Sequence, residues 1–108
     1  MIFHMPDDWD ELTCINHLQR KIILLSIAYY DFDCSPISDS DYDWLSQELA
    51  RRMRTCENVE ESRYWYAFKD YDGSTGYFLY SRLTAEDRLY LRNIAAIGLD
   101  GMGRFDIS

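Results

Sequence analysis

The chain has 108 residues, of which 47% are hydrophobic and 16% aromatic, so it can form one globular domain and is not a disordered chain. Its formal net charge of -8 at pH 7 argues against direct nucleic-acid binding through a basic groove, because an acidic surface repels phosphate backbones. Residues 1–50 hold ten Asp and Glu against only Arg20 and Lys21, whereas residues 51–108 balance nine acids with nine bases. The acidic half therefore suits a protein with a basic surface, including one that normally holds nucleic acid.

The cysteines and the apolar segments indicate a cytoplasmic protein. Cys14, Cys34 and Cys56 are odd in number and widely spaced, and no CxxC motif is present, which predicts reduced thiols and no zinc site. The N-terminus lacks the basic region of a signal peptide. The longest apolar run, residues 22–30, is too short to cross a bilayer, so we expect no membrane span.

The first predicted helix forms the core of the domain. Asp7 is a candidate N-cap, and the helix should end near Tyr30. Apolar residues recur at spacings of three and four along one face: Ile15, Leu18, Ile22, Leu25 and Tyr29. Ile23, Leu24 and Ile27 widen this stripe, which predicts a helix that is covered on two sides.

A second helix should pack antiparallel to the first. Residues 31–37 form a predicted loop, because Pro36 cannot continue a helix comfortably. Ser38 and Asp41 have the spacing of a capping box, and the helix should continue to about Thr55. Its predicted buried residues are Tyr42, Leu45, Leu49 and Met53, and its predicted charged outer face is Glu48, Arg51 and Arg52. The short loop between the helices predicts a helical hairpin.

The pattern then changes to alternation, which predicts a β-hairpin. Aromatic residues alternate over residues 64–69 and again over residues 77–82. Asp72-Gly73 between these runs is typical of a hairpin turn. One face of this hairpin should pack on the helices, and aromatic residues on the other face should be covered or form a contact surface.

A third helix should complete the fold. Thr84 and Asp87 again have capping-box spacing, and Gly98 is the expected residue after a helix that ends at Ile97. Its predicted inner face is Tyr90, Ile94 and Ile97. The sequence thus predicts a single α+β domain, with a helical hairpin over residues 1–57, a β-hairpin plus helix over residues 62–98, and a loose tail over residues 99–108.

No catalytic or metal-binding motif is recognisable. The spacing Asp39-x-Asp41-x-Asp43 suggests an EF-hand, but the Gly and Glu that its loop requires are replaced by Trp44 and Ala50. Acidic residues at a helix N-terminus explain the pattern better. The chain also lacks a Gly-rich phosphate loop and a nucleophile motif. We therefore expect no enzyme activity, no metal and no bound cofactor.

The stretch of residues 29–45, with five aspartates and no Lys or Arg, matches a family pattern. The sequence I-S-D-S-D-Y-D-W-L fits the pattern I-x-D-x-[DE]-Y-D-x-L. The matching residues are Tyr29, Asp33, Ile37, Asp39, Tyr42, Asp43 and Leu45. Over residues 21–49 the chain resembles the small N-terminal helical module, of the Ia type, of NAD-dependent bacterial DNA ligases, which binds nicotinamide mononucleotide.

The resemblance implies a ligand and also shows departures from the family. It places Tyr29, Asp39, Tyr42 and Asp43 on nicotinamide-binding positions, where tyrosine faces and carboxylates suit a cationic ring. A family histidine is replaced by Tyr30, and the loop proline is displaced by one position. No nucleotidyltransferase domain follows, and residues 69–73 are one residue longer than the Lys-x-Asp-Gly motif of the ligase nucleophile. The chain is therefore not expected to act as a ligase alone.

Two functions remain as predictions. The first is a small acidic, non-catalytic interaction protein, of the kind by which phages inhibit bacterial nucleic-acid-binding enzymes or defence complexes. Besides the nicotinamide positions, its expected contact residues are Asp31, Asp33, Asp41, Trp65, Tyr66, Phe78 and Tyr80. The second is a module that binds nicotinamide mononucleotide or NAD, either sequestering it or acting beside another protein. The identity of the partner and the oligomeric state are left open.

Overall fold

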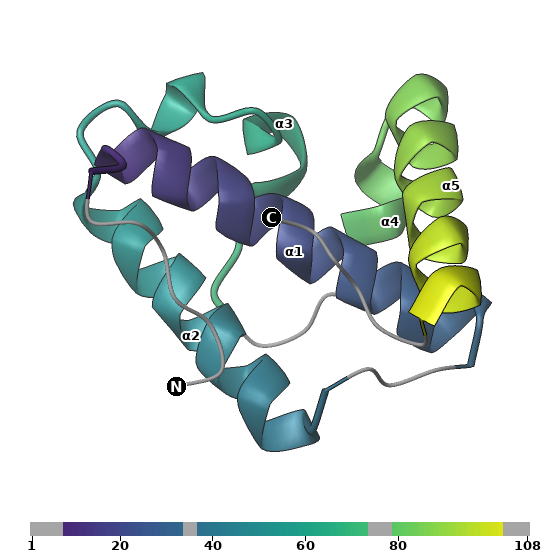
Figure 1. The fold of residues 1–108 in the computed structure, drawn as a ribbon. Helices are drawn as coiled ribbons and strands as arrows, with labels where there is room; N and C mark the ends of the chain where they lie inside the picture. Colours follow the sequence, from purple (N-terminus) through teal and green to yellow (C-terminus); the bar gives the residue numbers. More distant parts are fainter. Residues whose placement is uncertain (1–7, 34–36, 74–78, 103–108) are drawn as a thin grey trace.

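The computed structural model describes residues 8–33, 37–73 and 79–102, with side chains as far as Ile97. Every regular element in this part of the chain is helical (Figure 1). In order they are α1 (Glu11–Asp31), α2 (Asp39–Thr55), the 3-10 turn η1 (Val59–Glu61), α3 (Trp65–Phe68), α4 (Leu79–Arg82) and α5 (Ala85–Met102). The predicted α+β class is therefore wrong, since no strand occurs in the residues described.

Helix α1 is the centre of the fold, as the sequence predicts. Its N-cap is Asp10 instead of Asp7, and the Asp10 carboxylate accepts a hydrogen bond of 2.8 Å from the Thr13 N–H. All residues from Ile22 to Ala28 are buried, because α1 contacts α2 on one side and α4 and α5 on the other (Figure 1). The helix ends at Asp31, where its last full turn leaves Tyr29 exposed instead of buried.

The predicted antiparallel hairpin of α1 and α2 is confirmed. Ser38 caps α2, because its hydroxyl accepts a hydrogen bond of 3.1 Å from the Asp41 N–H. Near the end of α2, Arg52 forms an ion pair with Glu11 at the start of α1. The buried face of α2 is Leu45, Ser46, Leu49, Ala50 and Met53, and Tyr42 is half-buried. Glu48 pairs with Arg51 and Arg52 on the outer face, as expected.

The predicted β-hairpin is wrong for the residues that the structure describes, since both alternating runs contain short helices there. Tyr64, Ala67 and Phe68 are buried, and their spacing of three and four is helical. Leu79 and Leu83 are likewise buried four residues apart. Burial of one side of each short helix in the core therefore outweighs the strand preference that the alternating aromatic residues indicate. Phe78 lies outside the described residues.

The Asp72-Gly73 turn exists, although it joins no strands. Gly73 has φ +85°, which a residue with a side chain rarely adopts. A Cβ atom at this position would lie 3.0 Å from the backbone oxygen of Ser46. The Gln47 side chain also donates a hydrogen bond of 3.4 Å to the Gly73 carbonyl. Glycine therefore lets the chain turn while it touches the backbone of α2.

Helix α5 begins as predicted but faces α1 with other residues. The Thr84 hydroxyl accepts a hydrogen bond of 3.1 Å from the Asp87 N–H. The helix runs to Met102, so the predicted end at Ile97 is wrong, as is the role of Gly98 as the residue after the helix. The predicted inner face is wrong for Tyr90 and Ile97, which are 54% and 71% exposed, whereas Ile94 is half-buried against the core as expected. The buried residues are Asp87, Leu91 and Ala95. The predicted tail beyond Met102 lies outside the described residues.

Two further sequence expectations concern the cysteines and the membrane. Cys14 and Cys56 are free thiols, and Cys34 lies outside the described residues. Within the part of the chain that the structure describes, no helix has both the length and the apolar character needed to span a bilayer.

Candidate functional site

The end of α1 and the start of α2 both carry exposed aromatic and acidic side chains. The exposed fractions are 53% for Tyr29, 52% for Tyr30 and 40% for Trp44. Large aromatic side chains are costly to leave in water and are common anchors of protein interfaces. We call the following residues the acidic end: Tyr29, Tyr30, Asp33, Asp39, Asp41, Asp43 and Trp44.

The carboxylates of the acidic end have no basic partner among the described residues. No ion pair there engages Asp33, Asp39, Asp41 or Asp43. Asp39 and Asp41 lie in the first turn of α2, where negative charge also stabilises the helix dipole. The four charges therefore produce a local negative field that nothing within this part of the chain neutralises.

Asp31, which the sequence groups with these carboxylates, has a different role. Its carboxylate lies 3.3 Å from the Arg92 guanidinium, which in turn sits 5.0 Å from the centre of the Phe32 ring. Tyr80 lies close enough to Asp31 for that carboxylate to raise the pKa of its phenol, after the larger effect of burial. Asp31 thus holds α5 against the end of α1.

Two tyrosines of the acidic end contact each other, and Tyr30 also lies near the half-buried Tyr42. The rings of Tyr29 and Tyr30 meet edge to face, with centroids 4.9 Å apart. The Tyr42 hydroxyl lies 2.9 Å from the Ser26 hydroxyl, which donates its own proton to the Ile22 carbonyl. Burial raises the pKa of Tyr42, and Tyr30 and Asp43 are close enough to Tyr42 to raise it further.

Asp39 and Asp43, four residues apart on α2, are both exposed. Of the four positions that the ligase resemblance singles out, Tyr29, Asp39 and Asp43 face solvent, while Tyr42 is half-buried with its hydroxyl tied to Ser26. A ligand would compete with Ser26 for the Tyr42 hydroxyl.

The remaining aromatic contact candidates make internal contacts. Trp65 is half-buried against the core. The Tyr66 hydroxyl donates a hydrogen bond of 2.5 Å to the Asp87 carboxylate, and Tyr80 is half-buried with the Arg88 guanidinium 5.3 Å from its ring centre. Because the β-hairpin does not exist, these side chains do not form the single aromatic face that the alternation predicts.

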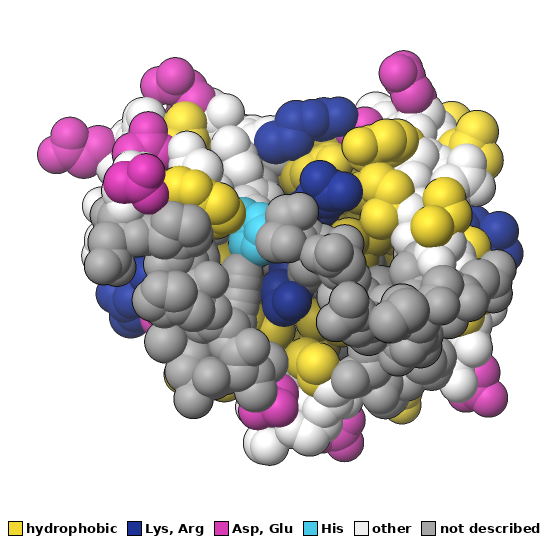
Figure 2. All heavy atoms as spheres, viewed as in Figure 1, with side chains coloured by type: hydrophobic (Ala, Val, Ile, Leu, Met, Phe, Trp, Pro, Cys, Tyr) yellow, Lys and Arg dark blue, Asp and Glu magenta, His cyan; other side chains and the backbone are white. Residues whose placement is uncertain are grey.

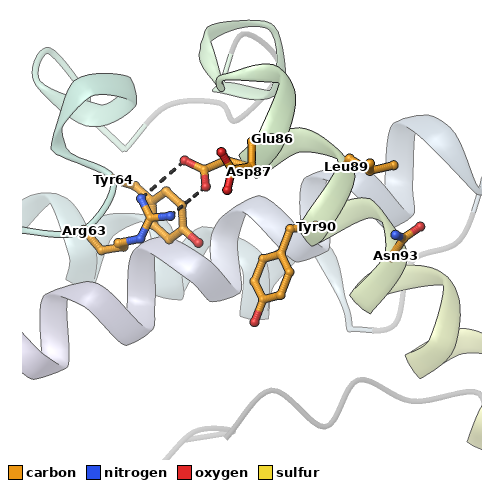
Figure 3. Close-up of a pocket in the computed structure, with 7 residues that line it drawn as sticks. All are labelled: Arg63, Tyr64, Glu86, Asp87, Leu89, Tyr90 and Asn93. Atoms are coloured by element: carbon orange, nitrogen blue, oxygen red, sulfur yellow. Dashed lines mark hydrogen bonds and ion pairs between the residues drawn. The ribbon is translucent and has the colours of Figure 1, made fainter.

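A second surface, which sequence analysis does not reveal, lies beside α5. An open groove of about 680 Å³ lies between residues 63–64 and the first half of α5. Figure 3 shows the residues that line it. Its lining residues are Arg63, Tyr64, Glu86, Asp87, Leu89, Tyr90 and Asn93, and we call it the α5 groove. Arg63 forms an ion pair of 2.6 Å with Asp87 and lies 4.6 Å from the Tyr64 ring centre.

Asp87 organises this groove. Its carboxylate accepts hydrogen bonds from Arg63 and Tyr66, which hold its pKa below the usual range. The capping spacing of Thr84 and Asp87 is visible in the sequence, but Arg63 lies 24 residues away from Asp87 and only the folded chain pairs them.

Among the described residues, neither His17 nor any group of metal-binding side chains forms a catalytic or metal-binding arrangement. Burial, followed by Lys21 and Arg20, lowers the pKa of His17, and its ring contacts the Trp9 ring at 5.2 Å between centroids. No group of three His, Cys, Asp or Glu side chains in the described part of the chain could hold a metal ion.

Comparisons with known proteins identified no relative of this chain. No protein-family model matches the chain, and searches of curated proteins and of solved structures also found no match.

Proposed function

We propose that this chain is a small, non-catalytic interaction protein that binds a partner with a basic surface through the acidic end. The observation that carries this proposal is the coincidence of exposed Tyr29, Tyr30 and Trp44 with four carboxylates that have no ion pair in the described residues. Elsewhere on the described surface, Glu11, Glu48, Asp70 and Asp87 are paired with arginines, whereas Glu57, Glu60 and Glu61 form no ion pair with the described residues.

Charge and aromatic area contribute differently to such a contact. The carboxylates speed encounter and orient the partner over a Debye length of about 8 Å in physiological salt. Affinity comes from large side chains that lose contact with water, of which Trp44 is the strongest candidate. A bacterial protein that normally binds nucleic acid has the matching basic surface, and occupying that surface would inhibit it.

The experiment compares two sets of charge removals of equal size. One variant carries Asp39→Asn, Asp41→Asn and Asp43→Asn, and its control carries Glu57→Gln, Glu60→Gln and Glu61→Gln, all exposed or half-buried positions without ion pairs in the described residues. Both variants lose three negative charges. Each protein is immobilised, loaded with bacterial lysate and with a defined oligolysine peptide, and eluted with a salt gradient.

We expect the native chain and the Glu variant to retain the same basic protein and to release it at similar salt concentrations. The Asp variant should release it at a much lower salt concentration, and Trp44→Ala should shorten its residence without changing the salt dependence. Equal retention by the Asp and Glu variants would show that the acidic end is not the binding surface.

Nicotinamide mononucleotide is a second candidate ligand for the same end of the molecule. It is favoured by Tyr30, which lies close enough to Tyr42 to raise the pKa of its phenol, and by the neighbouring Asp43, because aromatic rings and a carboxylate suit a cationic ring. Calorimetry with millimolar nicotinamide mononucleotide tests it, using Asp43→Asn as the binding variant and Glu57→Gln as the control. Binding heat that Asp43→Asn abolishes supports a nucleotide ligand, whereas no heat with the native chain rejects it.

A further inference from the structure

The segment before α3 is held against α1, and this contact brings an arginine of α1 to the α5 groove. The Asn16 side-chain oxygen accepts a hydrogen bond of 2.6 Å from the Arg63 N–H. The buried Gln19 side chain accepts one of 3.1 Å from the Tyr64 N–H. Arg20 is the next residue of α1 and lies one turn beyond Asn16, on the same side of the helix. It therefore faces the wall of the groove that Arg63 and Tyr64 form.

The charge of Arg20 acts on the Tyr64 side chain of this wall. Burial raises the pKa of the Tyr64 phenol, and the nearby charges of Arg63 and Arg20 oppose this rise. Tyr64 is 4% exposed and lines the groove, with the Arg63 guanidinium 4.6 Å from its ring centre. Two guanidinium groups, one from α1 and one from the segment before α3, therefore approach the same phenol.

Arg20 has no counter-ion within the part of the chain that the structure describes. No ion pair or hydrogen bond there engages its guanidinium. Its Nε atom is buried without a partner, whereas its two terminal nitrogens remain accessible. Burial, followed by the charges of Lys21 and Arg20, lowers the pKa of His17 on the same side of α1. A half-buried cation close to like charges is stabilised by a bound anion.

Basic side chains gather on this face of the molecule. In Figure 2, dark blue and cyan side chains lie near the centre of the face, where α1 crosses it in Figure 1, and most of the magenta carboxylates lie towards its edges. Of the two acids that line the groove, Asp87 is paired with Arg63. The other, Glu86, is exposed, so water and salt screen its charge. The field near Tyr64 is therefore positive, although the whole chain is acidic.

The rest of the groove suits a flat ring. Tyr90 is 54% exposed, and Figure 3 shows its ring projecting from α5 over α1, on the side toward which the Tyr64 hydroxyl points. Leu89 adds apolar area, and the Asn93 amide offers a donor and an acceptor to the edge of a base. The volume of about 680 Å³ falls within the range of small-molecule sites, about 300 to 1,000 Å³. Bases of every kind stack on exposed aromatic rings such as that of Tyr90.

We propose that the α5 groove binds a nucleoside monophosphate, with the phosphate at Arg20 and the base against Tyr90. The terminal nitrogens of Arg20 and the Tyr64 hydroxyl donate hydrogen bonds to the phosphate oxygens, which supplies the anion that this guanidinium lacks. Nucleic acid carries the same groups, but a chain with a net charge of -8 repels a polyanion, so the ligand is a free mononucleotide. The groove is separate from the acidic end, so this inference does not depend on the function proposed above.

Calorimetry of the full chain with each of the four common nucleoside monophosphates measures the binding. We expect at least one of them to bind with a Kd below about 1 mM. Arg20→Gln should weaken this binding at least about tenfold, and Arg20→Lys, which keeps the charge but loses the planar fork, should weaken it less. Tyr90→Ala should weaken it at least about threefold, and its side chain is exposed enough for the variant to fold.

Arg54→Gln is the matched control for the loss of one positive charge. Arg54 is an exposed residue of α2 without an ion pair in the described residues. This variant should change the Kd by less than about twofold. Equal losses in Arg20→Gln and Arg54→Gln would show that net charge, and not the groove, governs binding.

Glu86→Gln tests the charge of the groove in the opposite direction. Removing this carboxylate should tighten binding about twofold to threefold, because it repels the phosphate. Glu57→Gln, which removes the same charge outside the groove, should leave the Kd unchanged. Both positions are exposed, so both variants should unfold at the temperature of the native chain. An identical effect of the two changes would contradict a phosphate in the groove.

Simpler and larger ligands distinguish the sources of the phosphate. Adenosine and inorganic phosphate should each bind more weakly than the monophosphate, because each makes only one of the two contacts. Inorganic phosphate that binds as tightly as the best nucleotide would rule out the base contact at Tyr90. A short oligonucleotide that binds more tightly than any mononucleotide would replace the proposed ligand with nucleic acid.

Nuclear magnetic resonance locates the ligand on the chain. The amide signals of Tyr64 and Asn93 should shift during the titration, while those of Asp39 and Asp43 at the acidic end should not. Shifts confined to the acidic end would contradict the proposed site. Absence of binding by all four monophosphates up to about 10 mM would overturn the proposal.

Discussion

The acidic end and the exposed face of α5 both contain large side chains, yet they differ in composition. We call the residues Leu89, Tyr90, Asn93 and Ile97 of this face the α5 stripe. The acidic end combines Tyr29, Tyr30 and Trp44 with four carboxylates that lack ion pairs within the described residues. The α5 stripe combines Leu89, Tyr90 and Ile97 with the uncharged Asn93. A charged surface acts at long range and loses strength in salt, whereas an apolar surface acts only at contact and depends on shape. One small domain can therefore offer two binding surfaces that respond to different conditions.

The two surfaces are also held in place by different kinds of contact. The acidic end is carried by the α1–α2 hairpin, whose caps and apolar stripes are local. The α5 stripe is held in place by contacts that join distant parts of the chain, chiefly Leu91 against the core and Asp87 against Arg63. Perturbing either support should affect one surface more than the other.

The largest expected effect is that of Leu91→Ala. Leu91 is fully buried where α5 packs on the core, and truncating such a side chain costs about 3 kcal/mol of unfolding free energy. Urea denaturation measures this loss. Leu89→Ala is the matched control, because Leu89 is 63% exposed and its truncation should change the unfolding free energy by no more than about 0.5 kcal/mol. At concentrations of urea where the variant remains folded, binding at the acidic end should persist. Equal losses at the two leucines would contradict the packing of α5.

Asp87→Ala should have the next largest effect. It leaves the Arg63 guanidinium and the Tyr66 hydroxyl without their acceptor and should cost about 2 kcal/mol. Glu86→Ala, the exposed neighbour, is the control and should be nearly neutral.

The effect of Asp87 should depend on pH. Because Arg63 and Tyr66 hold the pKa of folded Asp87 below its usual value of 3.8, the folded state binds this proton less readily than the unfolded state. The stabilisation is therefore complete above that usual value and disappears as pH falls through the lower, folded pKa. Native and variant stabilities should converge in strong acid, and a difference that persists there would exclude the carboxylate as its source.

Tyr42→Phe should have a smaller effect. It removes the 2.9 Å contact with the Ser26 hydroxyl, for an expected loss of about 1 kcal/mol, while Tyr29→Phe on the exposed ring should change little. Burial raises the pKa of folded Tyr42 above its usual value of 10.0, so its stabilisation is present below pH 10 and is lost as pH rises through the folded value. Thermal unfolding between pH 7 and about pH 11 should show a shallower alkaline loss in the variant than in the native chain.

Salt should have the smallest effect on stability but a clear effect on binding at the acidic end. Raising NaCl from about 50 mM to about 500 mM should weaken oligolysine binding there at least about tenfold. Binding that salt leaves unchanged would exclude the carboxylates of the acidic end as its source.

The acidic end could be recognised from the sequence because most of its determinants are local. Residues 29–45 combine tyrosines and aspartates in one short stretch, and the cap at Ser38 sets which side of α2 they occupy. The pairing of Asp31 with Arg92 could not be recognised, since 61 residues separate them. Composition thus identified the charged surface but not which of its carboxylates is neutralised.

The amino-acid sequence by itself determined the α1–α2 hairpin. Its helices are long, each has its own cap, and apolar residues repeat every three or four positions, so local interactions suffice. The structure of residues 56–102 was decided only by tertiary packing. Helices α3 and α4 have four residues each, too few to form alone, and exist because Phe68 and Leu79 are buried in the core. The rotation of α5 was likewise decided by packing, because Leu91 and Ala95 fit against α1 while Tyr90 and Ile97, equally apolar in the sequence, remain outside.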